Sequence, residues 1–202
     1  MKIAAFITSY DRPEMLQNVV NHLRGQGIEP LIFLDGVTEH RGKKGFWKTW
    51  NEILQAAEKI EADIYLFMPD DFEDIDIDRI KYLHTKLKRP YAFNIINDGR
   101  TKCWVNKACV DMGQYYSVGF VDCGFFCGRD TLDKLGYWMN PPYKAWWQQS
   151  ENISSGVGMM LSKRLYNAGV RCYKPKYSLA KHGDHESKMH PQERQQTPLK
   201  SI

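Results

Sequence analysis

Short apolar runs alternate with helically spaced apolar residues along the first part of the chain. Continuous apolar runs at 3–7, 31–34 and 64–68 predict buried strands. Between them, apolar positions recur every three or four residues over 14–24 and 46–60, which predicts two helices. Three alternations of strand and helix are typical of an α/β fold, in which a parallel sheet is covered by helices on both faces.

The rest of the chain continues this pattern less regularly. The further predicted elements are a helix over 76–87, strands over 91–96 and 170–173, a strand pair or bend over 118–127, and a helix between Ser154 and Gly169. After His190 the residues become polar, with prolines and glutamines. We therefore expect a single domain over 1–190 and a polar tail over 191–202.

Composition and charge say more about the cellular location of the protein than about its reaction. The chain of 202 residues carries a net charge of +4, which is compatible with a polyanionic partner without pointing to one. No apolar run approaches the roughly 20 residues that span a bilayer, so no membrane partner is expected. The five cysteines are odd in number and too sparse for a disulfide framework. These features predict a cytoplasmic protein.

A cluster of acids follows the strand predicted at 64–68. Asp71 and Glu73 are two positions apart, so in an extended segment both side chains lie on one side, where they form part of a shell for Mg²⁺ or Mn²⁺. The alternative is that the acids cap the next helix. We adopt that alternative for Asp74, Asp76 and Asp78, and favour a cation site for Asp70, Asp71 and Glu73, because ligands bind beyond the carboxyl ends of such strands.

Several segments together resemble family 2-like glycosyltransferases of the GT-A type. They are Thr8-Ser9-Tyr10-Asp11-Arg12-Pro13 after the first strand, Asp35-Gly36 after the second, Gly45-Phe46-Trp47-Lys48-Thr49-Trp50-Asn51 at a helix start, Asp70-Asp71-Phe72-Glu73, and Lys181-His182-Gly183-Asp184-His185 near the end. The last segment is similar to that of small glycosyltransferases encoded by bacteriophages. The resemblance spans Met1 to His190.

This resemblance implies a Rossmann-like GT-A fold, a nucleotide-diphosphate sugar as donor and a divalent metal. It implies metal binding by Asp71, Glu73 and His182, and the imidazole favours Mn²⁺ over Mg²⁺. The residues expected to bind the donor are Thr8, Tyr10, Arg12, Asp35, Asn51 and Asp70, with Arg100 as the best candidate among the basic residues for neutralising phosphate.

The chain departs from the family where a catalytic base is expected. Many inverting members carry a Glu-Asp pair at the start of the last long helix, and this chain has Val157 and Gly158 there. The candidate bases are instead Asp122, in a buried-looking segment, and Glu151, just before that helix. Inversion or retention of the sugar configuration stays open, as does the oligomeric state.

The expected activity is transfer of a sugar to a hydroxyl group. The basic charge and the phage-like terminal segment favour a 5-hydroxymethylated pyrimidine in DNA as acceptor, and a cell-surface or capsular glycan is the second choice. A non-catalytic nucleic-acid-binding module is the alternative of another class. A nucleotidyltransferase is disfavoured because no glycine-rich, lysine-bearing phosphate loop follows the first strand.

Overall fold

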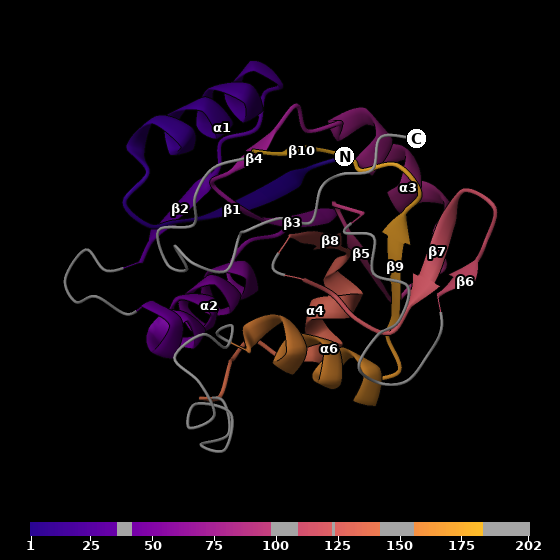
Figure 1. Ribbon diagram of the computed structural model, residues 1–202. Coiled ribbons are helices and arrows are strands. Elements are labelled where there is room, and N and C mark those ends of the chain that lie inside the picture. Colours follow the sequence, from indigo (N-terminus) through magenta and orange to yellow (C-terminus); the bar gives the residue numbers. More distant parts are fainter. Residues whose placement is uncertain (36–41, 98–108, 123, 142–155, 184–202) are drawn as a thin grey trace.

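The computed structural model describes residues 1–35, 42–97, 109–122, 124–141 and 156–183 (Figure 1). The strands are β1 (Ile3–Ser9), β2 (Leu31–Leu34), β3 (Ile64–Pro69), β4 (Phe72–Glu73), β5 (Tyr91–Asn94), β6 (Val110–Asp111), β7 (Tyr115–Val118), β8 (Phe125–Cys127), β9 (Arg171–Pro175) and β10 (Lys181–His182). The helices are α1 (Pro13–Gly25), α2 (Gly42–Glu58), α3 (Ile77–Lys86), α4 (Arg129–Leu135) and α6 (Val157–Asn167). The predicted α/β class is confirmed.

Eight of these strands form one mostly parallel sheet in the order β2-β1-β3-β8-β5-β9-β7-β6. β1 pairs in parallel with β2 and β3, and β5 pairs in parallel with β9. β8 lies between β3 and β5 and runs antiparallel to both, so β3 and β5 share one direction. The carboxyl ends of β1, β2, β3, β5 and β9 therefore lie along one side of the sheet, which we call the carboxyl edge.

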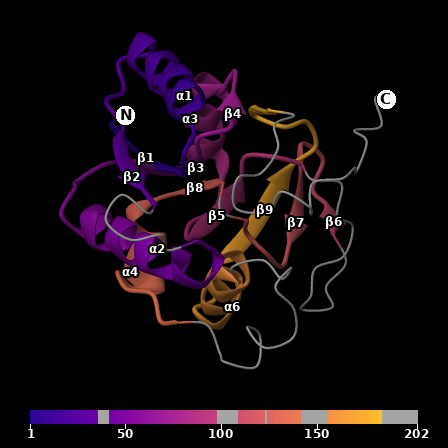
Figure 2. The same cartoon turned by 60° about the vertical axis from the view of Figure 1, so that its left-hand side comes forward.

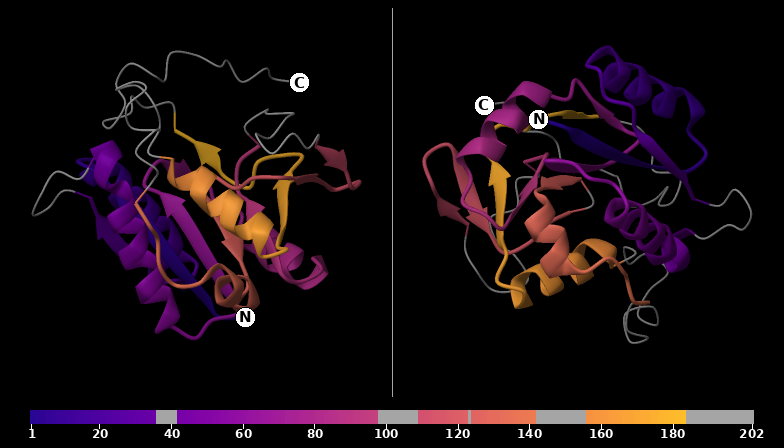
Figure 3. Two further views of the ribbon diagram at one scale, coloured as in Figure 1. Left: turned by 90° about the horizontal axis from the view of Figure 1, so that it is seen from below. Right: turned by 180° about the vertical axis from the view of Figure 1, so that it is seen from behind.

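Helices cover both faces of the sheet, and each face has its own apolar core. In β1, Ala4 and Phe6 pack with α2, α4 and α6, whereas Ala5 and Ile7 pack with α1 and α3. Figure 2 shows these two helical layers, and the left panel of Figure 3 looks onto the layer of α2 and α6. Because both faces are buried, the positions from Ile3 to Ile7 are all apolar, which explains the continuous run in the sequence.

The helices form where apolar spacing and end signals agree. In α2, Trp50, Ile53, Leu54 and Ala57 are buried and follow the spacing of one helical face. α1 begins at Pro13, whose fixed φ angle and missing N–H suit the first helical position. These signals explain why the long elements were predictable.

The differences from the expected elements are concentrated in short segments. α2 begins at Gly42, one turn before the predicted start, and α6 begins at Val157 after Gly156 in the left-handed region. The segment 118–127 contains the end of β7 and the whole of β8. Elements that were not expected are β4, β6, most of β7, α4 and the strand pairing of β10.

Three of the features expected from the sequence lie outside the described residues: Arg100, Glu151 and the tail over 191–202. Within the described ranges, no helix combines the length and the apolar character that crossing a bilayer requires.

Candidate functional site

Polar side chains from neighbouring strands meet at the carboxyl edge. The backbone N–H of Asp35, directly after β2, donates to the carbonyl oxygen of Ser9 in β1 over 2.8 Å. On the other side of β1, Thr8 is level with Pro69 of β3, and Asp70 follows at once. The predicted donor residues Thr8, Asp35 and Asp70 thus lie at the ends of adjacent strands, where open α/β sheets bind ligands.

Arg12 holds both carboxylates of the turn after β3. Its Nη1 lies 3.3 Å from Oδ1 of Asp70 and 3.0 Å from Oδ2 of Asp71. The hydroxyl of Ser9 donates to Oδ2 of Asp70 over 2.6 Å. The side chains of Arg12, Asp70 and Asp71 are only 10%, 5% and 1% exposed. One guanidinium therefore faces two nearly enclosed carboxylates, which favours the approach of a further cation.

The carboxyl group of Asp70 is hard to ionise in this position. Burial raises its pKa above the ordinary value, against the opposing effects of the Ser9 hydrogen bond and the charge of Arg12, and the charge of Asp71 raises it further. An acid whose pKa is raised by folding destabilises the folded state as the pH rises through that raised pKa. Ionised Asp70 is thus held at a cost to stability, which is typical of functional sites.

We expect Asp70→Asn to raise the melting temperature at neutral pH, because it removes a desolvated charge and leaves Arg12 paired with Asp71. The advantage should shrink as the pH falls and vanish below the ordinary carboxyl pKa of about 3.9, where both forms are uncharged. Thermal melts between pH 3 and pH 8 measure this. Asp74→Asn is the control: the ion pair with Lys181 lowers the pKa of Asp74, so the effect at neutral pH has the opposite sign. Equal melting temperatures for Asp70→Asn and wild type at every pH would contradict the burial effect.

His182, at the far end of the described chain, lies near the carboxylate of Asp71. β10 pairs antiparallel with β4, which places His182 opposite Phe72, and the two rings meet edge to face at 5.8 Å. The backbone N–H of Gly183 donates to the carbonyl oxygen of Asp71 over 2.8 Å. As a result, Nε2 of His182 lies 3.8 Å from Oδ2 of Asp71. The sequence did not predict the two short strands that produce this arrangement.

Glu73, the third predicted metal ligand, is placed differently. Residues 70 and 71 form a turn, so the expectation that Asp71 and Glu73 share an extended segment is wrong. Asp71 is buried, whereas Glu73 is exposed and pairs with Lys181 in the β4–β10 ladder. Among the described residues, no three His, Cys, Asp or Glu side chains are grouped so that they could hold a metal ion. The structure thus brings together two of the three predicted ligands, Asp71 and His182.

A second buried acid lies beside this cluster. Asp35 is 4% exposed, and the hydroxyl of Thr49 in α2 donates to its Oδ1 over 2.9 Å. Thr49 was missed as a functional candidate, although it lies in the helix-opening segment quoted for the family resemblance. Its distinguishing signal is a polar side chain on the otherwise apolar face of α2, 1% exposed. The pair fixes the orientation of the Asp35 carboxylate at the end of β2.

The remaining predicted donor residues have varied positions. Thr8 is buried in the sheet, and its hydroxyl donates to the carbonyl oxygen of Met68 over 3.5 Å. Tyr10 is half-buried in the loop between β1 and α1. Asn51 lies in α2, where its Oδ1 accepts a hydrogen bond from the backbone N–H of Met139 over 2.9 Å. Asn51 therefore anchors the chain after α4.

Asp122, the predicted base that the structure describes, is exposed at the carboxyl edge. Its backbone N–H donates to Oδ1 of Asn94, at the end of β5, over 2.7 Å. A Cβ atom at Gly158 would lie 3.4 Å from Oδ1 of Asp122. The glycine in the first turn of α6 thus gives the carboxylate room to approach this helix end, whose dipole favours a negative charge.

Gly124, two residues after Asp122, lies close to the ring of Phe72. A Cβ atom there would meet ring atoms of Phe72 at 2.5 and 2.6 Å. We expect Gly124→Ala to push this ring out of place and to lower the free energy of unfolding by about 1–3 kcal/mol. Because Phe72 contacts His182, the substitution should also disturb the position of the imidazole. Denaturant unfolding measures the effect, with Gly25→Ala as control because its Cβ would meet no atom within 4 Å. A Gly124→Ala variant as stable as wild type would refute this packing.

No protein-family model matches the chain, and no curated protein matches it in sequence. Among solved structures, the chain is similar to A197 from STIV, with 15% sequence identity and a TM-score of 0.48. The alignment covers 90% of this chain and 84% of A197.

Proposed function

We propose that the protein is a glycosyltransferase that moves a sugar from a nucleotide-diphosphate donor to a hydroxyl acceptor. The observation that carries the proposal is the convergence of Arg12, Asp70, Asp71 and His182 at the carboxyl edge. These residues come from β1, β3 and β10 with their flanking turns, and they are the residues to which the family resemblance assigns donor and metal binding.

The donor half of the site is divided between two acidic positions. Asp35, oriented by Thr49, is proposed to bind the base or ribose of the nucleotide. Asp70, fixed by Ser9 and Arg12, is proposed to lie near the ribose of the nucleotide. An ionised carboxylate has about four lone-pair sites, so it can accept a hydrogen bond from a sugar hydroxyl in addition to those from protein donors.

Asp71 and His182, at the turn after β3 and in β10, are the residues that would hold a divalent cation. Two ligands of one Mg²⁺ or Mn²⁺ ion, each at about 2.1 Å, lie between about 3 and 4 Å apart, and the carboxylate of Asp71 and the imidazole of His182 are separated by 3.8 Å. A carboxylate with an imidazole favours Mn²⁺. When bound, the cation offsets the charge that accumulates on the leaving diphosphate. Arg12 adds a permanent positive charge beside Asp71.

Asp122 is the proposed base on the acceptor side. Its carboxylate is exposed, and Asn94 holds its backbone at the carboxyl edge. Deprotonation of the acceptor hydroxyl needs such a group within hydrogen-bonding reach of the incoming oxygen. Asp122 lies beside Gly158, in the helix where the family carries its acids, so it supplies a carboxylate near that position from another segment.

The proposed acceptor is a 5-hydroxymethylated pyrimidine in DNA. The basic charge of the chain supports it, together with the likeness of the segment around His182 to phage-encoded glycosyltransferases. A cell-surface or capsular glycan is the alternative acceptor for the same chemistry.

A donor-hydrolysis screen tests the proposal. The wild-type chain is incubated with a panel of nucleotide sugars and Mn²⁺, with and without hydroxymethylated DNA, and release of nucleoside diphosphate is measured. We expect release from at least one donor, faster with the DNA. Asp122→Asn should reduce transfer to DNA while leaving donor binding unchanged, because the base does not contact the donor.

The outcomes separate the alternatives. If no donor releases nucleoside diphosphate, the enzyme proposal is overturned and the nucleic-acid-binding module is the alternative that stands. If a glycan accelerates donor hydrolysis and hydroxymethylated DNA does not, the glycan would replace DNA as the proposed acceptor. The proposal that the protein is a glycosyltransferase would stand.

A further inference from the structure

Two lysines flank one tyrosine ring at the carboxyl edge. Tyr116 in β7 lies level with Lys174 in β9, and the ammonium of Lys174 is 5.9 Å from the centre of the Tyr116 ring. The ammonium of Lys176, two positions further along, lies 5.5 Å from the same ring and 2.7 Å from Oδ2 of Asp111. Lys174 is buried, whereas Lys176 is partly open to solvent. The unit places positive charge around an aromatic ring.

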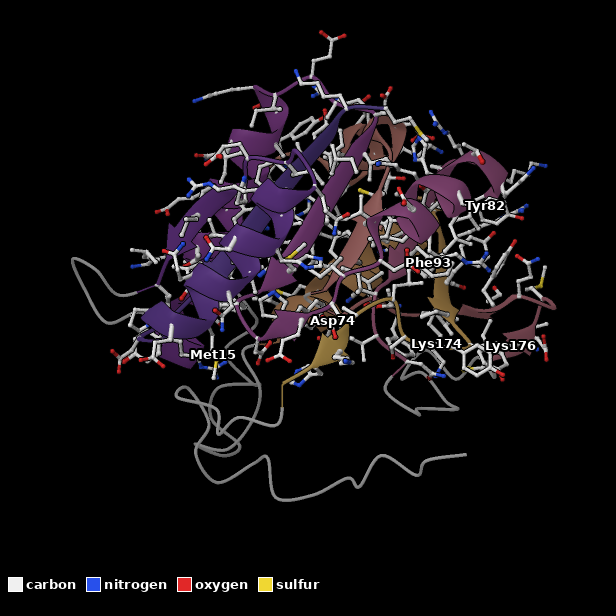
Figure 4. The ribbon with its side chains drawn as sticks, turned by 90° about the horizontal axis from the view of Figure 1, so that it is seen from above. Met15, Asp74, Tyr82, Phe93, Lys174 and Lys176 are labelled. Atoms are coloured by element: carbon white, nitrogen blue, oxygen red, sulfur yellow. The ribbon has the colours of Figure 1, made fainter. Side chains whose placement is uncertain are left out.

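A second unit, also made of two basic side chains and a tyrosine ring, lies on α3. The guanidinium of Arg79 is 4.9 Å from the ring centre of Tyr82, and the ammonium of Lys86 is 5.7 Å from it. Arg79 also donates to the side chain of Gln114 over 3.3 Å, which links α3 to the turn between β6 and β7. Figure 4 shows Tyr82, Lys174 and Lys176 on the same side of the molecule.

Tyr177 follows Lys176 and stands out by its exposure. It is 87% exposed, although a tyrosine ring is largely apolar. The segment is held from behind: Asn97 donates its side-chain N–H to the carbonyl oxygen of Lys176 over 2.8 Å, and its backbone N–H to Ser178 over 2.9 Å. An exposed aromatic ring on an anchored backbone is pre-positioned for contact with a flat partner.

These side chains lie close to the proposed active site. Lys176 and Tyr177 follow the carboxyl end of β9, and the chain continues from there through Leu179 to His182. Leu179 is itself bonded to the end of β5, through its backbone N–H and the carbonyl oxygen of Ile95 over 2.8 Å. In Figure 4, Lys174 and Lys176 lie along the same edge as Asp74, which precedes α3. Tyr177 and His182 thus belong to one segment, which is bonded to the carboxyl edge at Leu179.

We propose that Arg79, Tyr82, Tyr116, Lys174, Lys176 and Tyr177 form a basic–aromatic strip that binds single-stranded nucleic acid and leads it to the carboxyl edge. This inference rests on the proposed function only for the reason why the protein would bind nucleic acid. The observations that support the strip are separate from those that support the glycosyltransferase proposal. Phosphates pair with Arg79 and Lys176, while the buried Lys174 adds positive charge beside the Tyr116 ring. Bases stack on the exposed rings of Tyr82 and Tyr177.

The combination of rings and charges selects this partner. A polyanion without bases would use the lysines and arginine alone, and would gain nothing from the exposed tyrosines. Duplex DNA keeps its bases stacked internally, so their faces are closed to Tyr177. An unpaired or flipped-out base offers both a phosphate and a free face.

Fluorescence anisotropy with a labelled, unmodified single-stranded oligonucleotide tests the strip without any sugar donor. We expect binding that weakens steeply with salt, and a loss of about tenfold in affinity for Lys176→Gln combined with Tyr177→Ala. Tyr82→Ala should weaken binding in the same direction. The control is Lys134→Gln combined with Tyr166→Ala, an exposed lysine and tyrosine on α4 and α6, which should bind as wild type does.

The outcomes distinguish the strip from the enzyme proposal. The binding assay contains no sugar donor, so a failed donor screen would leave its result intact. No binding by wild type, or equal affinity for the strip and control variants, would overturn the strip. The strip would also be overturned if Lys176→Gln weakened the binding while Tyr177→Ala and Tyr82→Ala did not. That result would show a polyanion site that does not use bases.

Discussion

Arg12→Ala is expected to lower the free energy of unfolding by about 3–5 kcal/mol, the usual cost of removing one partner from a buried ion pair. The Arg12 side chain is 10% exposed and its guanidinium faces Asp70 and Asp71, so its loss leaves two neighbouring buried carboxylates without their shared cation. Chemical denaturation at neutral pH measures the change. The loss should become smaller at low pH, where protonation removes the repulsion.

The matched control is Arg24→Ala. Arg24 also pairs with an acid, Glu29, but the two side chains are 53% and 69% exposed. Solvent-exposed pairs contribute little to stability, so this variant should unfold almost as wild type does. Arg12→Lys should recover part of the loss because it restores the charge without the planar fork. Equal stability of Arg12→Ala and Arg24→Ala would show that the carboxylate pair does not depend on Arg12.

Asp71→Asn is expected to reduce kcat for sugar transfer at least about a hundredfold, since the loss of a direct ligand exceeds that of an outer-sphere partner. The substitution keeps the size of the side chain and the backbone bond to Gly183, so the pairing of β4 with β10 should persist. Steady-state kinetics with the best donor from the screen measure kcat, and circular dichroism checks the fold.

Asp74→Asn controls for the loss of an acid from the same segment. Asp74 is exposed and pairs with Lys181 on the surface, so its removal should leave kcat close to that of wild type. Activity of Asp71→Asn equal to that of Asp74→Asn would remove Asp71 from the site. Addition of excess Mn²⁺ should restore part of the activity if the loss arises from weakened metal binding.

The sequence contained enough to predict the central elements of the fold. β1 and β3 are buried on both faces, so their residues form continuous apolar runs that stand out from the polar turns. α2 carries its buried residues at helical spacing over several turns. By contrast, β4, β6 and β10 have two residues each, too few to show any period, and they form only because a partner strand lies beside them.

The candidate site was predictable as a set of residues, but not as an arrangement. The position after β3 identified Asp70 and Asp71, and the resemblance identified Arg12 and His182. The contact of Arg12 with both carboxylates depends on the turn between β1 and α1, where Asp11 has a φ of 50°. No spacing rule anticipates such a turn.

Glu73 shows the limit of an argument from alternation. Strand periodicity assumes an extended backbone, and residues 70 and 71 form a turn before β4 begins. The turn thus leaves Glu73 exposed, although Asp71, two positions earlier, is buried. The bonds from Ser9 to Asp70 and from Thr49 to Asp35 were missed for a related reason, because short hydroxyl side chains have many alternative partners.

The most direct test of the proposed donor site is the affinity for nucleoside diphosphates, measured by calorimetry with Mn²⁺ and with a chelator. Asp71 and His182 are proposed to bind a cation together with the diphosphate, so Mn²⁺ should strengthen binding at least about tenfold in wild type. Asp71→Asn and His182→Ala should each abolish that gain. Equal affinity with Mn²⁺ and with the chelator, unchanged in both variants, would contradict it.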